Sequence, residues 1–157
     1  MEKFFSPRGI ALIGATPNKL KGGYSILFNL KQGYTGRIYP VNPRYEEIDG
    51  LRCYPSVQDV PDPVELAIIF IPAARVENAV SECGRRGIKA IMIQSAGFAE
   101  SGESGLDQQN KLLKISRASG VRIWGPNCMG LVDARRKFVF SFVSPAIWEE
   151  GLAIGPV

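Results

Sequence analysis

The 157-residue sequence contains no histidine, and this absence rules out several kinds of chemistry at once. Without histidine the chain cannot build a Ser-His-Asp triad, a histidine metal site or a phosphohistidine of its own. Cysteine is scarce as well. Cys53, Cys83 and Cys128 are odd in number, far apart and without a C-x-x-C pair, which is typical of reduced thiols in the cytoplasm.

Long apolar runs and charge blocks are also missing. No run approaches the ~20 apolar residues of a membrane helix, and residues 1–7 lack the apolar core of a signal peptide. We therefore expect a cytoplasmic protein without membrane contact. Lys and Arg number 19 against 15 Asp and Glu, a net charge of +4 without any basic cluster. This scattered surplus favours a small anionic ligand and argues against nucleic acid.

Short apolar runs alternate with helical patterns along most of the chain. Strands are predicted at residues 10–13, 37–41, 66–71, 88–93 and 121–124. Helices are predicted from residue 23 to 32, from about 73 to 86 and from 104 to 119, the last opened by a capping box at Ser104. The order predicts an α/β fold: a Rossmann-like, doubly wound, mostly parallel sheet in three αβα layers.

The alternation stops near residue 134, and we place a domain boundary there. Residues 1–134 are expected to form the Rossmann-like domain. Residues 135–157 are expected to form a covering arm or linker and the truncated start of a following domain. Such a truncation would expose apolar surface near residues 138–143, and an exposed apolar patch favours a homodimer.

Ligands of an open α/β sheet bind beyond the carboxyl ends of its strands. Five loops with little side-chain bulk follow those ends: Gly14-Ala15-Thr16-Pro17, Asn42-Pro43-Arg44, Pro72-Ala73-Ala74, Ser95-Ala96-Gly97-Phe98 and Gly125-Pro126-Asn127. Any single loop is explained equally well by the glycines and prolines that commonly end strands. Five together favour a trough for a long ligand that lies against backbone.

The first two loops depart from the fingerprint of a nicotinamide site. Gly14-Ala15-Thr16 lacks the second glycine of G-x-G-x-x-G, and the second strand ends at Arg44 instead of an acidic residue. An arginine there suits an extra phosphate on the nucleotide sugar, which both NADP and coenzyme A carry. A solvated loop charge also explains Arg44, and spacing alone leaves the two ligands open.

Five motifs occur in order: Ile-Ala-Leu-Ile-Gly-Ala at 10–15, Tyr-Pro-Val-Asn-Pro at 39–43, Ile-Pro-Ala at 71–73, Ser-Ala-Gly-Phe-Ala-Glu at 95–100 and Gly-Pro-Asn-Cys-Met-Gly at 125–130. Together they resemble the N-terminal CoA-binding domain of NDP-forming acyl-CoA synthetases, which include the ADP-forming acetate–CoA ligases. The α subunit of succinyl-CoA synthetase is a more distant relative. In this family, the N-terminal domain holds CoA, and a phosphohistidine loop in the next domain passes phosphate between nucleotide and acid.

The resemblance implies which residues meet CoA. Thr16, Pro17, Asn18 and Lys19 would surround the phosphates, and Gly14 and Ala15 of the same loop would also bind the cofactor. Val41, Asn42, Pro43 and Arg44 would also bind CoA, with Arg44 facing the 3′-phosphate end. Pro72 and Val76 would border the adenine. Ser95, Ala96 and Gly97 would line the path of the pantetheine, and Asn127 would lie near the thiol.

The resemblance also implies a division of labour. The chain would bind CoA or acyl-CoA without a catalytic residue or a metal of its own. Further domains or subunits of the synthetase would be needed to make acyl-CoA, ADP and phosphate from an acid, CoA and ATP. Cys128 is expected to be a packed thiol, and Glu100 a solvated loop carboxylate.

Two other functions stay open at this point. One is an NADP-binding oxidoreductase domain, which Arg44 fits as well as it fits CoA. The other is a regulatory domain that senses CoA or acyl-CoA and controls an attached enzyme. A histidine-bearing domain directly after Val157 would decide for the ligase.

Overall fold

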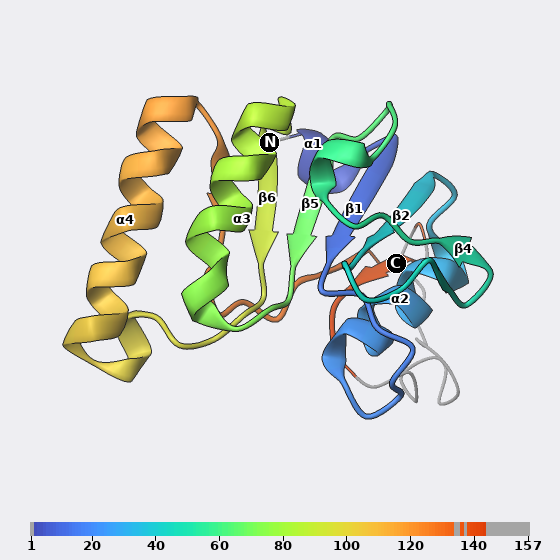
Figure 1. Cartoon of the computed structure of the whole chain (residues 1–157), viewed down its shortest axis with the longest axis horizontal. Helices are drawn as coiled ribbons and strands as arrows, with labels where there is room; N and C mark the ends of the chain where they lie inside the picture. The colour runs from blue at the N-terminus through green and yellow to red at the C-terminus, as the bar shows by residue number, and fades with distance from the viewer. Residues whose placement is uncertain (1, 134–135, 137, 144–157) are drawn as a thin grey trace, which may run out of the picture.

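The computed structural model describes residues 2–133, 136 and 138–143 of the chain, and Figure 1 shows their arrangement. Five parallel strands form one sheet in the order β2-β1-β5-β6-β7. These strands are β1 (Gly9–Ile13), β2 (Arg37–Val41), β5 (Leu66–Ile69), β6 (Ala90–Ile93) and β7 (Arg122–Trp124). Four further strands form two small hairpins: β3 (Glu47–Ile48), β4 (Leu51–Arg52), β8 (Leu131–Asp133) and β9 (Phe138–Phe140).

Helices cover both faces of the sheet, which confirms the predicted Rossmann-like fold. α3 (Ala73–Arg86) and α4 (Glu103–Ser119) lie side by side on one face. α2 (Gly22–Gly33) and the short α1 (Glu2–Phe5) belong to the opposite layer, and short 3-10 turns lie at Val57–Asp59 and Ala99–Ser101.

The three central strands β1, β5 and β6 have no polar side chain and are buried at every position, because both faces of the sheet are covered there. In β1, Ala11 and Ile13 pack into the core beneath α3 and α4, whereas Ile10 and Leu12 pack into the second core beneath α2. Successive side chains of a strand point to opposite faces, so a run without alternation supplies both cores at once. This is the physical reason that the apolar runs predicted a covered parallel sheet.

The predicted capping box at Ser104 is wrong. α4 begins at Glu103, so Ser104 already lies inside the first turn, whereas a capping side chain has to precede it. Gly102 occupies the cap position at φ +95°, and its carbonyl accepts a hydrogen bond from the Leu106 N–H at 3.0 Å. The predicted end of α3 is confirmed, because Gly87 follows Arg86 in the left-handed conformation at φ +86°.

The segment after the sheet forms an arm over α2. β9 pairs with β8 in antiparallel register and packs against α2. Phe138, Val139 and Phe140 are buried, so the expectation of an exposed apolar patch at these residues is wrong. The reason given for a homodimer is thereby removed, and the homodimer itself stays a prediction. The predicted start of another domain falls on residues 151–157, which lie outside the described residues.

Two buried amide side chains attach the arm. Asn29 of α2 donates hydrogen bonds to the carbonyls of Ser141 and Val143, both at 2.9 Å. Gln94, at the end of β6, donates to the carbonyl of Phe140 at 2.6 Å and accepts from the Phe142 N–H at 3.2 Å. The arm is therefore bonded both to the helix beneath it and to the sheet.

Glu65 joins the N-terminal segment to the start of β5. Its carboxylate accepts hydrogen bonds from the Lys3 ammonium at 2.9 Å and from the Arg8 guanidinium at 2.9 Å and backbone N–H at 2.8 Å. Burial opposes the charge, but these bonds outweigh it and lower the pKa of Glu65 from its usual 4.5 to about 2.

The lowered pKa predicts a loss of stability in acid. The contribution of the Glu65 carboxylate is fully present above pH 4.5 and is lost as the pH falls towards 2. The difference in free energy of unfolding between wild type and Glu65→Gln should therefore shrink over this range, measured by urea unfolding at a series of pH values. A difference that is independent of pH would contradict the prediction.

In the described part of the chain, no helix combines the length and apolar character needed to cross a membrane.

Candidate functional site

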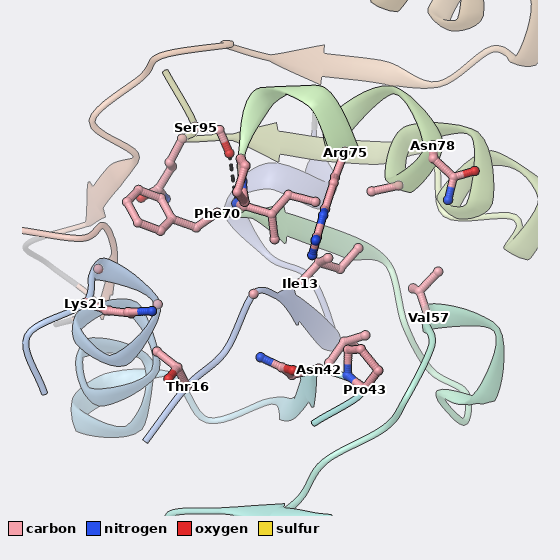
Figure 2. A pocket seen from close by; sticks show the side chains of 18 of the residues that line it. Ile13, Thr16, Lys21, Asn42, Pro43, Val57, Phe70, Arg75, Asn78 and Ser95 are labelled. Carbon is pink, nitrogen blue, oxygen red and sulfur yellow. Dashed lines mark hydrogen bonds between the residues drawn. The ribbon is translucent and has the colours of Figure 1, made fainter. Parts of the chain in front are cut away.

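A cavity of about 1020 Å³ opens at the carboxyl ends of the strands. Residues that follow all five strands of the central sheet line it, including Gly14, Asn42, Ile71, Ser95 and Asn127. Figure 2 shows labelled side chains from several of these loops around one space. Ligand pockets typically measure about 300–1,000 Å³, so this cavity has room for a large ligand.

The structure brings ten of the sixteen predicted site residues to this cavity: Gly14, Thr16, Val41, Asn42, Pro43, Arg44, Pro72, Ser95, Ala96 and Asn127. Among the described residues that form the wall, the other six are missing: Ala15, Pro17, Asn18, Lys19, Val76 and Gly97. Loops from distant parts of the sequence therefore meet as expected, but not with every residue.

The structure shows why several of these residues do not line the cavity. Ala15 and Val76 have no exposed surface and pack in the two cores. Val76 therefore does not reach the cavity, which corrects its predicted place beside an adenine. Asn18 lies in a loop that bonds to itself, since its side-chain oxygen accepts from the Leu20 N–H at 3.0 Å. The Gly97 N–H donates to the Glu100 carboxylate at 2.6 Å.

Asn42 and Ser95 hold the loops in place. The Asn42 amide donates to the Ala15 carbonyl at 2.8 Å, and its oxygen accepts from the Arg44 N–H at 3.0 Å. These bonds tie the end of β2 to the loop after β1. The Ser95 hydroxyl accepts from the Ile71 N–H at 3.0 Å, the bond dashed in Figure 2, and so joins the ends of β6 and β5.

Two glycines allow three backbone segments to touch beside the cavity. Gly14 has φ +101°, and a Cβ built on it would lie 2.2 Å from the Phe70 carbonyl oxygen. A Cβ on Gly23 would lie 2.1 Å from the Gly14 carbonyl oxygen. The loop after β1 is thus packed against both the end of β5 and the start of α2, and no side chain fits between them.

Among the described residues of the cavity wall, three are cationic, and of these the sequence predicted only Arg44. Lys21 immediately precedes α2, and Arg75 lies in the first turn of α3. Figure 2 shows both side chains extending into the space. The signal that could have found Arg75 was its position three residues after Pro72, where a helix begins and its first turn still faces the strand ends.

Helix N-termini add to this positive character. Lys21 and Pro72 hold the cap positions of α2 and α3, and neither side chain makes a capping hydrogen bond. Neither helix has an acidic residue in its first turn. The partial positive charge at a helix N-terminus favours anions, and phosphate is the usual one. The cavity therefore suits a ligand with several phosphates.

The remaining candidate groups are structural. The Cys128 thiol is half-buried, 3.4 Å from the Ile93 carbonyl oxygen, and burial raises its pKa, so it is not an activated nucleophile. The Phe98 and Gly97 N–H groups lower the pKa of the Glu100 carboxylate, which braces the loop between them. No group of His, Cys, Asp or Glu suited to a metal ion occurs among the residues that the structure describes.

Comparison with known protein families shows which family the chain belongs to. The model of a family described as "CoA binding domain" matches residues 8–134. The chain belongs to this CoA-binding domain family. The match spans all five strands of the sheet and confirms the resemblance drawn from the five motifs.

The ADP-forming acetate–CoA ligases that this chain matches are much longer than the chain. An ADP-forming acetate–CoA ligase of Archaeoglobus fulgidus is 41% identical over 152 residues, which are 96% of this chain and 23% of the relative. The α subunit of an ADP-forming acetate–CoA ligase of Pyrococcus furiosus is 42% identical over 146 residues, 93% of this chain and 32% of the subunit. The chain thus spans about a quarter to a third of their length.

A solved structure agrees with these relatives. The dinucleotide-forming acetyl-coenzyme A synthetase 1 of Ca. Korarchaeum cryptofilum, in complex with phosphate and ADP, superposes with a TM-score of 0.85 at 37% identity. The superposition covers 90% of this chain and 30% of the synthetase. The backbone of the CoA-binding domain therefore has the arrangement found in part of that synthetase.

Proposed function

We propose that this chain is the CoA-binding domain of an ADP-forming acid–CoA ligase and that the cavity at the strand ends holds CoA. The observation that carries the proposal is the coincidence of the matched family region with a cavity lined by Lys21, Arg44 and Arg75. Only one acidic side chain, Glu82, belongs to the described wall. A ligand with a diphosphate and a third phosphate on its sugar is complementary to this net positive charge.

The lining residues fit CoA along the length of the cavity. Arg44 would meet the 3′-phosphate, and Thr16, Lys21 and the bare N–H groups that open α2 would meet the diphosphate. The loop of Ser95 and Ala96 would line the pantetheine, with Asn127 near its thiol. When bound, CoA supplies the thiol that carries the acyl group.

The remaining chemistry would come from other parts of a synthetase. The chain has no histidine to carry a phosphoryl group, and its relatives are three to four times longer. We propose that further domains or subunits activate the acid and deliver it to the CoA thiol. We also propose that the enzyme acts in the cytoplasm, in keeping with three free cysteines.

Calorimetric titration of the 157-residue chain with CoA and with 3′-dephospho-CoA tests the proposal. CoA should bind at least about tenfold more tightly, because a guanidinium–phosphate hydrogen bond contributes roughly 1.5–3 kcal/mol. In Arg44→Gln, the affinity for CoA should fall towards that for 3′-dephospho-CoA. Arg117→Gln, an exposed arginine of α4 outside the cavity, is the matched control and should bind like wild type.

The titrations also separate the other functions. A failure to bind CoA would overturn the ligand assignment, and equal affinities for the two forms would remove Arg44 from its role. Tighter binding of NADPH than of CoA would favour the oxidoreductase, which the comparisons do not favour. They do not favour the CoA-sensing domain either.

A further inference from the structure

We infer that Arg75 is a second guanidinium for the phosphate on the nucleotide sugar of CoA, acting together with Arg44. The inference rests on the proposed function and adds a specificity-determining residue to it. Neither the family resemblance nor the five sequence motifs point to Arg75.

The first argument is placement. Figure 2 shows the Arg75 side chain running from the first turn of α3 into the cavity, towards Asn42 and Pro43 on the opposite wall. Arg44 follows Pro43 directly and lines the same cavity. A ligand group between the end of β2 and the start of α3 would therefore have one arginine on each side.

The second argument is electrostatic. A cation in the first turn of a helix opposes the helix dipole, whereas a cation in the last turn is favoured. α3 follows the rule at its C-terminal end with Arg85 and Arg86, and breaks it at its N-terminal end with Arg75 and no acidic residue. Local rules are typically broken at functional sites. An anion bound beside Arg75 would offset the unfavourable position.

The third argument is the absence of an internal partner. In the described ranges, neither Arg75 nor Arg44 takes part in an ion pair, whereas Arg86 of the same helix lies 3.0 Å from an Asp62 carboxylate oxygen. The acidic residue of the cavity wall, Glu82, accepts a hydrogen bond from the Asn78 amide at 2.9 Å. The guanidinium group of Arg75 is thus available to a ligand.

The geometry also favours the sugar phosphate over the diphosphate. Lys21 and the start of α2 lie on the other side of the loop after β1 from Val57, Asn78 and Arg75 in Figure 2. The diphosphate would find its hydrogen-bond donors at Lys21 and the start of α2. The 3′-phosphate is a monoester and carries nearly two negative charges in a small volume. Two planar guanidinium groups can bind such a dianion from two sides.

The test compares CoA with 3′-dephospho-CoA on wild type, Arg75→Gln, Arg44→Gln and the double variant by titration calorimetry. Arg75→Gln should weaken CoA binding about tenfold and leave 3′-dephospho-CoA within twofold. Arg75→Lys should fall between wild type and Arg75→Gln, because lysine keeps the charge but loses the fork. All four proteins should bind 3′-dephospho-CoA alike, and Arg117→Gln again serves as control.

Thermal unfolding of the free protein provides a second measurement. Arg75→Gln should melt at or slightly above the wild-type temperature, since it removes a cation from the unfavourable end of α3. Equal losses for both ligands, no loss for CoA, or a lower melting temperature would overturn the inference. A wild type that binds no CoA, or binds both forms equally, would instead overturn the proposed function on which it rests.

Discussion

Replacing Gly14 with alanine is expected to lower the free energy of unfolding by about 4 kcal/mol and to weaken CoA binding by at least about tenfold. The new Cβ would lie 2.2 Å from the Phe70 carbonyl oxygen, on a residue held at φ +101°. The loop after β1 and the end of β5 would have to separate, and both line the cavity. Urea unfolding and calorimetric titration with CoA measure the two effects.

The Gly87→Ala variant separates two effects that coincide at Gly14, the close contact of the new Cβ and the strain of a positive φ. Gly87 also has a positive φ, +86°, but nothing lies within 4 Å of a Cβ built there. We expect a loss of only about 1 kcal/mol and unchanged CoA binding. If the two variants lost the same stability, the close approach at Gly14 would not be the reason for its glycine.

Asn29→Leu is expected to lower the free energy of unfolding by about 3 kcal/mol. The leucine has a similar size, but it leaves the carbonyls of Ser141 and Val143 without the hydrogen bonds that the amide donates at 2.9 Å. The arm that these bonds hold also carries Phe142, whose ring packs 5.4 Å from that of Phe70 and lines the cavity. CoA binding should therefore weaken as well.

Asn110→Leu is the control for this variant, because Asn110 is an exposed residue of α4. Its effect on urea unfolding should stay within about 0.5 kcal/mol. An Asn29→Leu variant as stable as Asn110→Leu would show that the arm is held by apolar packing of Phe138 to Phe140 and not by the buried amide.

The order of strands and helices was predictable because it depends on local signals. Apolar runs without alternation at 66–71 and 88–93 indicated strands buried on both faces, and β5 and β6 occupy most of these runs. The element ends were less certain: Ser104 looked like a cap in the sequence, but the helix begins one residue before it. A cap depends on backbone angles that neighbouring residue types do not determine.

The sequence by itself determined that this protein is a doubly wound α/β domain, that its five strand-end loops belong to one site, and which family it resembles. Only the tertiary structure decided which side chains reach that site. Val76 is buried, and the side chains of Asn42 and Ser95 form hydrogen bonds that connect neighbouring loops. Lys21, Arg75 and Phe142 line the cavity. The reason is physical. Periodicity reports which face of an element is buried, whereas the position of a side chain in a cavity depends on how separate elements pack together.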